Sequence, residues 1–140
     1  MVGNWRADYD RAILDIKVAL QALECRLLLD GKYEHVFLLQ CAGREPCVAF
    51  IKLGSTGYWS MAADWYEAFN QFPRIAIFLT GPTRGYIVRA PQLGRMVEER
   101  VPQGPTNQYR LAERDLRGCD HFGTAQECGA ALGRIAQLTQ

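Results

Sequence analysis

Apolar side chains near the start of the chain recur at steps of three and four residues, which is the spacing of one face of an α-helix. Gly31 follows, and glycine readily adopts the left-handed conformation that often ends a helix. The pattern therefore predicts a long helix over residues 7–29. Its apolar face consists of Ile13, Ile16, Leu20, Leu23 and Leu27.

Two hairpins are predicted further along the chain, where apolar runs flank turn residues. The first joins a strand over residues 33–40 (YEHVFLLQ) to a strand over 47–53 (CVAFIKL) through a turn at 42–46. The second joins residues 74–80 (RIAIFLT) to 85–90 (GYIVRA). The run RIAIFLT is almost unbroken, which is typical of a strand buried on both faces.

Helical patterns separate these strands and close the chain. Ser60 can cap a helix over 61–72, and a proline at the first turn favours a short helix over 91–100. Residues 108–113 are predicted to form a further strand. Residues 124–127 (TAQE) form a capping box, which predicts a final helix.

This order of elements predicts an α/β (α+β) fold, a mixed β-sheet flanked by helices, in a single domain over residues 1–140. The longest apolar run, around residues 75–79, is far shorter than the roughly 20 residues that cross a bilayer. The first ten residues, MVGNWRADYD, lack the basic and then apolar stretch of a secretion signal. We therefore expect a cytoplasmic protein without a membrane partner.

The cysteine pattern predicts reduced thiols. The count of five is odd, and no secretion signal accompanies it. Cys25 is expected in the apolar stripe of the first helix. The spacings Cys41-x5-Cys47 and Cys119-x-His121-x6-Cys128 match no common zinc pattern.

The charge balance excludes strong nonspecific attraction to nucleic acid, because 16 basic residues face 15 acidic ones. The distribution is less even: residues 84–117 carry seven arginines against four acidic residues. Two explanations stay open, a patch that faces phosphate groups and an arginine bias from a GC-rich genome. The GxxxxGK[ST] and GxGxxG motifs are absent, so nucleotide-dependent chemistry is disfavoured.

The first hairpin offers a carboxylate and an amine at its rim. Because side chains alternate along a strand, Glu34 shares a face with Val36, and Lys52 shares one with Phe50. If both faces are the same, Glu34 and Lys52 meet, and Glu24 at the end of the first helix adds a second carboxylate. Metal-assisted phosphodiester hydrolysis requires such acids to hold the cation and a lysine to activate water.

At this point the chain resembles the PD-(D/E)xK, or restriction-endonuclease-like, superfamily, which includes Holliday-junction resolvases and Mrr-type restriction enzymes. The resemblance covers about residues 10–100, and residues 101–140 then form a C-terminal strand-helix addition. It implies Glu34 as a Mg²⁺ ligand and Lys52 as the activator. It also implies DNA rather than RNA as the substrate, and a homodimer, because these enzymes act on two strands.

The chain departs from the family at Phe50, where the motif has its second acid. The acid can have moved to the following helix, as Asp64 or Glu67, or Glu24 can supply the second carboxylate. Alternatively the domain has lost catalysis and kept binding, or the likeness is accidental and Lys52 is a solvated strand-end residue.

The loop after Lys52 and the second hairpin turn provide candidate nucleic-acid contacts. Ser55 and Thr56 offer hydroxyl donors, Arg84 offers a guanidinium, and Tyr58 and Trp59 can stack on an unpaired base. Trp59 can instead anchor the loop to the core.

The sequence therefore predicts a protein that binds or processes nucleic acid with a nuclease-like fold, as an atypical or inactive Mg²⁺-dependent endonuclease. The alternative is a non-enzymatic protein-interaction module with an accessory or defence-related role.

Overall fold

The computed structural model describes residues 5–29, 35–43, 46–54, 58–62, 74–81, 83–98 and 108–138. The first half of the chain forms α1 (Trp5–Gln21), β1 (Cys25–Leu29), β2 (Val36–Cys41), β3 (Cys47–Leu53), β4 (Tyr58–Ala62) and β5 (Arg74–Leu79). The second half forms β6 (Gly85–Arg89), α3 (Ala90–Glu98), β7 (Gln108–Ala112), the 3₁₀ turn η1 (Glu113–Leu116), β8 (Asp120–Phe122) and α4 (Ala125–Leu138).

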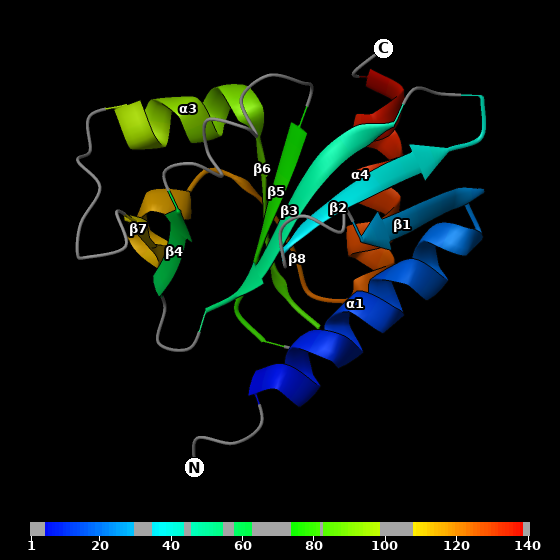
Figure 1. Cartoon of the computed structure of the whole chain (residues 1–140), viewed down its shortest axis with the longest axis horizontal. Coiled ribbons are helices and arrows are strands. Elements are labelled where there is room, and N and C mark those ends of the chain that lie inside the picture. Colours follow the sequence, from blue (N-terminus) through cyan, green and yellow to red (C-terminus); the bar gives the residue numbers. More distant parts are fainter. Residues whose placement is uncertain are drawn as a thin grey trace.

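Six of these strands form one mixed sheet in the order β1-β2-β3-β5-β6-β8, which confirms the predicted fold class (Figure 1). β1, β2 and β3 form an antiparallel meander, and β3 then pairs in parallel with β5. β6 and β8 continue the sheet by antiparallel pairing. β4 and β7 form a separate antiparallel pair.

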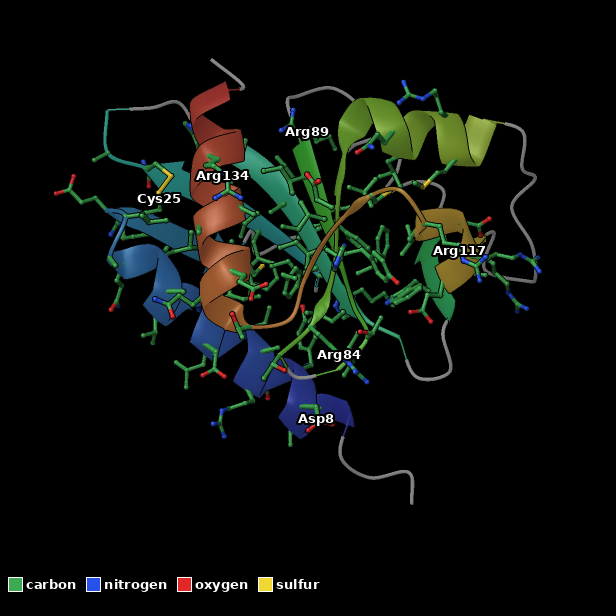
Figure 2. All side chains as sticks on the ribbon, turned by 180° about the vertical axis from the view of Figure 1, so that it is seen from behind. Asp8, Cys25, Arg84, Arg89, Arg117 and Arg134 are labelled. Atoms are coloured by element: carbon green, nitrogen blue, oxygen red, sulfur yellow. A yellow bond between two sulfur atoms is a disulfide. The ribbon has the colours of Figure 1, made fainter. Side chains whose placement is uncertain are left out.

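Each face of the sheet packs against its own layer. α1 and α4 cover one face, with Ile16, Leu20 and Leu132 buried against the sheet (Figure 2). The other face, here called the Phe50 face, packs Phe50 and Phe78 against α3 and the β4–β7 pair (Figure 1). Alternation along each strand divides the side chains between the two layers.

The predicted helix over 7–29 is wrong beyond Gln21. The chain turns at Glu24, which has a positive φ of 58°, and continues as β1. Apolar residues at 25, 27 and 29 fit strand alternation as well as they fit a helical stripe, and pairing with β2 selects the strand. Within the described residues, no helix is both long and apolar enough to cross a membrane.

A second correction concerns Ser60, which lies inside β4 and so does not cap a helix at residue 61. The rest of that predicted helix, residues 63–72, lies outside the described part of the chain. The sequence also missed β8, which is only three residues long. The predicted N-cap of the last helix is confirmed, because Thr124 Oγ1 accepts a hydrogen bond of 3.1 Å from the Glu127 amide. Glu127 Oε2 accepts a hydrogen bond from the Gly123 amide, one residue before the position that a capping box uses.

Cys25 and Cys41 form a disulfide, so the prediction of reduced thiols is wrong for this pair. The register of β1 and β2 places the two residues directly opposite each other, with Cα atoms 4.0 Å apart. Cys47, Cys119 and Cys128 are free and buried.

Candidate functional site

The parallel pairing of β3 and β5 brings the ends of both strands to one end of the sheet. Leu53 pairs with Leu79, and the Gly54 amide donates a hydrogen bond of 3.1 Å to the Leu79 carbonyl. β6 begins at the same end, because Gly85 also pairs with Leu79. The segments that follow β3 and β5 and precede β6 therefore share this end of the sheet.

A row of four side chains crosses this end of the sheet on the Phe50 face. Lys52 pairs with Phe78, Phe78 with Tyr86, and Tyr86 with His121. Paired residues point to the same face, so we call these four residues the Lys52–His121 row. With strands spaced about 4.8 Å apart, the Cα atoms of Lys52 and Tyr86 lie roughly 10 Å apart.

Lys52 is half-buried at the C-terminal end of β3. Val36 pairs with Phe50, and both contribute to the Phe50 face. Glu34 lies outside the described residues. Its neighbour His35 is described, and the His35 carbonyl accepts a hydrogen bond of 3.0 Å from the Ile51 amide.

His35 packs against α1 rather than towards solvent. Its side chain is 8% exposed, and Nδ1 lies 3.2 Å from the Tyr9 hydroxyl. That hydroxyl donates its one proton to the Ile51 carbonyl at 2.9 Å, so it accepts from Nδ1. These bonds connect α1 to the start of β2 and to Ile51, the residue before Lys52 in β3. No motif or spacing in the chain points to this role for Tyr9.

A cleft of about 410 Å³ opens beside the Lys52–His121 row. Six segments line it: the residue after β3, β4, the turn between β5 and β6, β6, η1 and β8. Figure 2 shows Arg84 at the lower end of the sheet. The polar lining side chains are Thr80, Arg84, Tyr86, Glu113 and His121.

Tyr86 links Glu113 to the row. Its hydroxyl donates a hydrogen bond of 3.0 Å to Glu113 Oε1. This bond raises the pKa of Tyr86, because ionisation would break it and place two anions together, and burial adds to the effect. Tyr86 therefore stays a neutral donor that orients the carboxylate, and His121 lies directly across the strand pair from it.

Trp59 lines the cleft as an anchor. Its side chain is 2% exposed, its Nε1–H donates to the Leu79 carbonyl at 3.0 Å, and its ring packs on Phe78. This burial contradicts the predicted stacking on a base and agrees with the anchoring alternative. Ser55, Thr56 and the Tyr58 side chain lie outside the described residues.

The predicted acids do not gather at Lys52 in the described part of the chain. Glu24 lies at the other end of the meander, where its carbonyl accepts a hydrogen bond from the Ala42 amide. The seven residue-to-residue steps from His35 to Ala42 span roughly 23 Å along β2, so Glu24 and Lys52 do not form a common site. Asp64 and Glu67 lie outside the described residues.

No metal cluster is present among the described side chains, counted as three or more His, Cys, Asp or Glu residues within reach of one ion. Cys119 is buried, and burial, together with the neighbouring Asp120, raises the pKa of its thiol. A neutral buried thiol is a poor nucleophile. Among the described residues, the cleft at this end of the sheet is lined by the carboxylate of Glu113. The sequence did not single out Glu113 because only the fold brings η1 to β6.

Comparison with models of protein families, with curated proteins and with solved structures finds no match for this chain. Its relation to the PD-(D/E)xK superfamily therefore stays a prediction from residues and element order. What the site does must follow from its own chemistry, which is one half-buried amine beside a cleft that holds a guanidinium, a phenol, a carboxylate and an imidazole.

Proposed function

We propose that the protein binds nucleic acid across the end of the sheet that carries Lys52 and Arg84, as a nuclease-like domain. The observation that carries the proposal is that Lys52 shares this end of the sheet with a cleft lined by Arg84, Tyr86 and His121. Lysine and arginine at such a rim suit phosphate oxygens, which supply most of the affinity for nucleic acid.

Binding of this kind depends steeply on salt. Each phosphate that a cation neutralises adds about 0.9 to the slope of log affinity against log salt for duplex DNA. Lys52→Ala and Arg84→Ala should therefore each weaken binding and lower the slope by about one. Arg134→Ala, an exposed arginine on α4 at the opposite face, is the matched control.

Fluorescence anisotropy with a labelled duplex and a labelled single strand, over a series of salt concentrations, measures these slopes. The proposal fails if neither probe is retained at low salt, or if Arg134→Ala changes the slope as much as Arg84→Ala does. DNA is the substrate that the family resemblance implies, and the two probes compare duplex with single strand.

The proposal also includes Mg²⁺-dependent cleavage of the bound DNA. Glu34 would hold the ion with Glu67, and Lys52 would activate the attacking water, which is the chemistry that the resemblance implies. Lys52→Ala should then abolish Mg²⁺-dependent cleavage of DNA while the chain keeps its thermal transition. Undiminished cleavage by that variant would remove this assignment without affecting the binding proposal.

A second candidate function, protein interaction, is supported by the position of exposed apolar side chains. Among the described residues, the large ones all lie in α1, β1 or the turn between them: Leu14, Val18, Leu23, Leu28 and Leu29. β1 is an edge strand of the described sheet. An apolar edge of this kind accepts a strand from another chain.

The backbone of β1 is complementary to a second copy of itself. The short Cα separation of Cys25 and Cys41 is typical of an antiparallel pair without mutual hydrogen bonds, so the N–H and C=O groups of Cys25, Leu27 and Leu29 point away from β2. An antiparallel copy centred on Leu27 pairs all three residues. The partner that we propose for this apolar edge is therefore a second copy of the chain, which gives a homodimer.

Sedimentation velocity tests the dimer. Leu29→Lys places a charge on the open edge and should yield monomers, because edge lysines oppose strand pairing. Gln126→Lys, on the exposed side of α4, should leave the oligomeric state unchanged. A wild-type chain that stays monomeric at high concentration excludes this homodimer.

A further inference from the structure

Two groups in the cleft, Glu113 and His121, take no part in phosphate binding by Lys52 and Arg84. Both side chains are exposed to solvent within the cleft, and they come from η1 and β8. Tyr86 stands between them, bonded to Glu113 at 3.0 Å and paired across the strands with His121. Carboxylates and imidazoles are the side chains that most often act as general base and general acid.

We propose that this cleft cleaves RNA by transferring the phosphoryl group from the 5′-oxygen of one nucleotide to the neighbouring 2′-hydroxyl, with Glu113 as general base and His121 as general acid. The inference rests on the proposed binding of nucleic acid at this end of the sheet, and it names RNA as the substrate class. This reaction does not need the second acid of the family motif, whose position Phe50 occupies in this chain.

The reaction balances without any further reactant. Glu113 Oε2, the oxygen not bonded to Tyr86, takes the proton of the 2′-hydroxyl. The 2′-oxygen forms a bond to phosphorus while the bond from phosphorus to the 5′-oxygen breaks. Protonated His121 gives its proton to the departing 5′-oxygen. The products are a 2′,3′-cyclic phosphate and a 5′-hydroxyl end.

The other polar side chains of the cleft fit the charge that develops in this step. Arg84 lies at the same cavity and offers two parallel N–H donors to the non-bridging phosphate oxygens. The Thr80 hydroxyl, which contacts the Arg84 carbonyl at 3.3 Å, is held on the turn that carries this guanidinium. Tyr86 fixes the direction of Glu113, so it acts as a positioning residue.

The 2′-hydroxyl determines the choice of RNA. The nucleophile belongs to the substrate, so the protein needs to supply proton transfer and charge stabilisation, which the cleft contains. A DNA strand lacks this hydroxyl and cannot follow this route. The same cleft can still bind a DNA backbone, because Arg84 contacts phosphate oxygens that both polymers share.

The test uses the full chain with a single-stranded RNA labelled at its 5′ end, in buffer that contains EDTA. We expect cleavage that yields 2′,3′-cyclic phosphate ends, and no cleavage where one 2′-deoxy nucleotide is placed at the scissile position. Glu113→Gln and His121→Ala should each lower the rate about 10²- to 10⁴-fold, the usual contribution of a general base or acid.

Asp120→Asn is the matched control, because Asp120 pairs with Ile87 and lies on the other face of β8. It should cleave at the wild-type rate. Tyr86→Phe should lower kcat and leave KM nearly unchanged, since it disturbs the orientation of Glu113 and not the binding of phosphate.

Several results would overturn the inference: no RNA cleavage, cleavage that EDTA abolishes, cleavage at the 2′-deoxy position, or wild-type rates in Glu113→Gln and His121→Ala. If RNA is bound in a salt-dependent manner and not cleaved, this inference fails while the proposed binding function stands. If neither RNA nor DNA is bound, both fail.

Discussion

The hydroxyl of Tyr9 offers a direct test of how the end of β3 is held in place. It donates to the Ile51 carbonyl at 2.9 Å and lies 3.2 Å from His35 Nδ1. Tyr9 and Ile51 are 3% and 0% exposed, so neither group can turn to bulk water. Tyr9→Phe removes this oxygen and leaves the ring in place.

The magnitude follows from the two partners. Leaving a buried donor or acceptor without its partner costs about 1–3 kcal/mol, so the loss at Ile51 and His35 together should lower the free energy of unfolding by roughly 2–6 kcal/mol. For a chain of this size each kcal/mol lowers the melting temperature by about 2–4 °C, which predicts a fall of roughly 4–24 °C.

Urea unfolding followed by circular dichroism measures this change, and Tyr86→Phe is the matched control. The Tyr86 hydroxyl bonds to Glu113 in an exposed environment, so its removal should change stability by less than about 0.5 kcal/mol. The reasoning is refuted if both variants unfold at the same urea concentration as the wild type, or if Tyr86→Phe loses as much stability as Tyr9→Phe.

Three further predictions concern stability. Burial raises the pKa of Cys128 to about 12, so the folded chain keeps a proton that the unfolded thiol loses above its ordinary value of 9.0. The free energy of unfolding should therefore fall from pH 9 towards 12. Urea titrations at several pH values should show a smaller fall in Cys128→Ala. Reducing the Cys25–Cys41 bond, which spans 16 residues, should lower the unfolding free energy by about 3 kcal/mol in urea titrations with and without dithiothreitol; an unchanged midpoint would contradict this. Gly129→Ala would place a Cβ 2.7 Å from that of Ala19, and the overpacking cost of about 1–3 kcal/mol should exceed the gain in helix propensity of about 1 kcal/mol, so calorimetry should record a lower melting temperature.

The parts of the fold that the sequence predicted well depend on local signals. β3, β5 and β6 are apolar runs bounded by turn residues, and α4 begins at a capping box, so each can be identified from its own residues. β1 was missed because its apolar residues continue the spacing of α1. Whether this segment forms a helix or a strand depends on β2, which supplies hydrogen bonds to β1 from elsewhere in the chain.

The candidate site divides in the same way. Lys52 was placed correctly at the end of β3, because a lysine after an apolar run marks a strand end. Glu113 and His121 carry no such local mark. They face one cleft because β6 pairs with β8 and Tyr86 bonds to η1, and these are contacts between distant segments that no spacing in the chain encodes.

The disulfide joins β1 to β2 at Cys25, where the two strands form a pair without mutual hydrogen bonds. Because hydrogen-bonded and non-hydrogen-bonded pairs alternate along the strand, hydrogen exchange in β1 should alternate as well. The amides of Arg26 and Leu28 face β2 and should exchange with deuterium slowly, whereas those of Leu27 and Leu29 face outward and should exchange quickly. Slow exchange at all four positions would be the signature of a strand from another molecule on this edge. A single deuterium-labelling experiment can therefore show which of the two sides of the strand is occupied in solution.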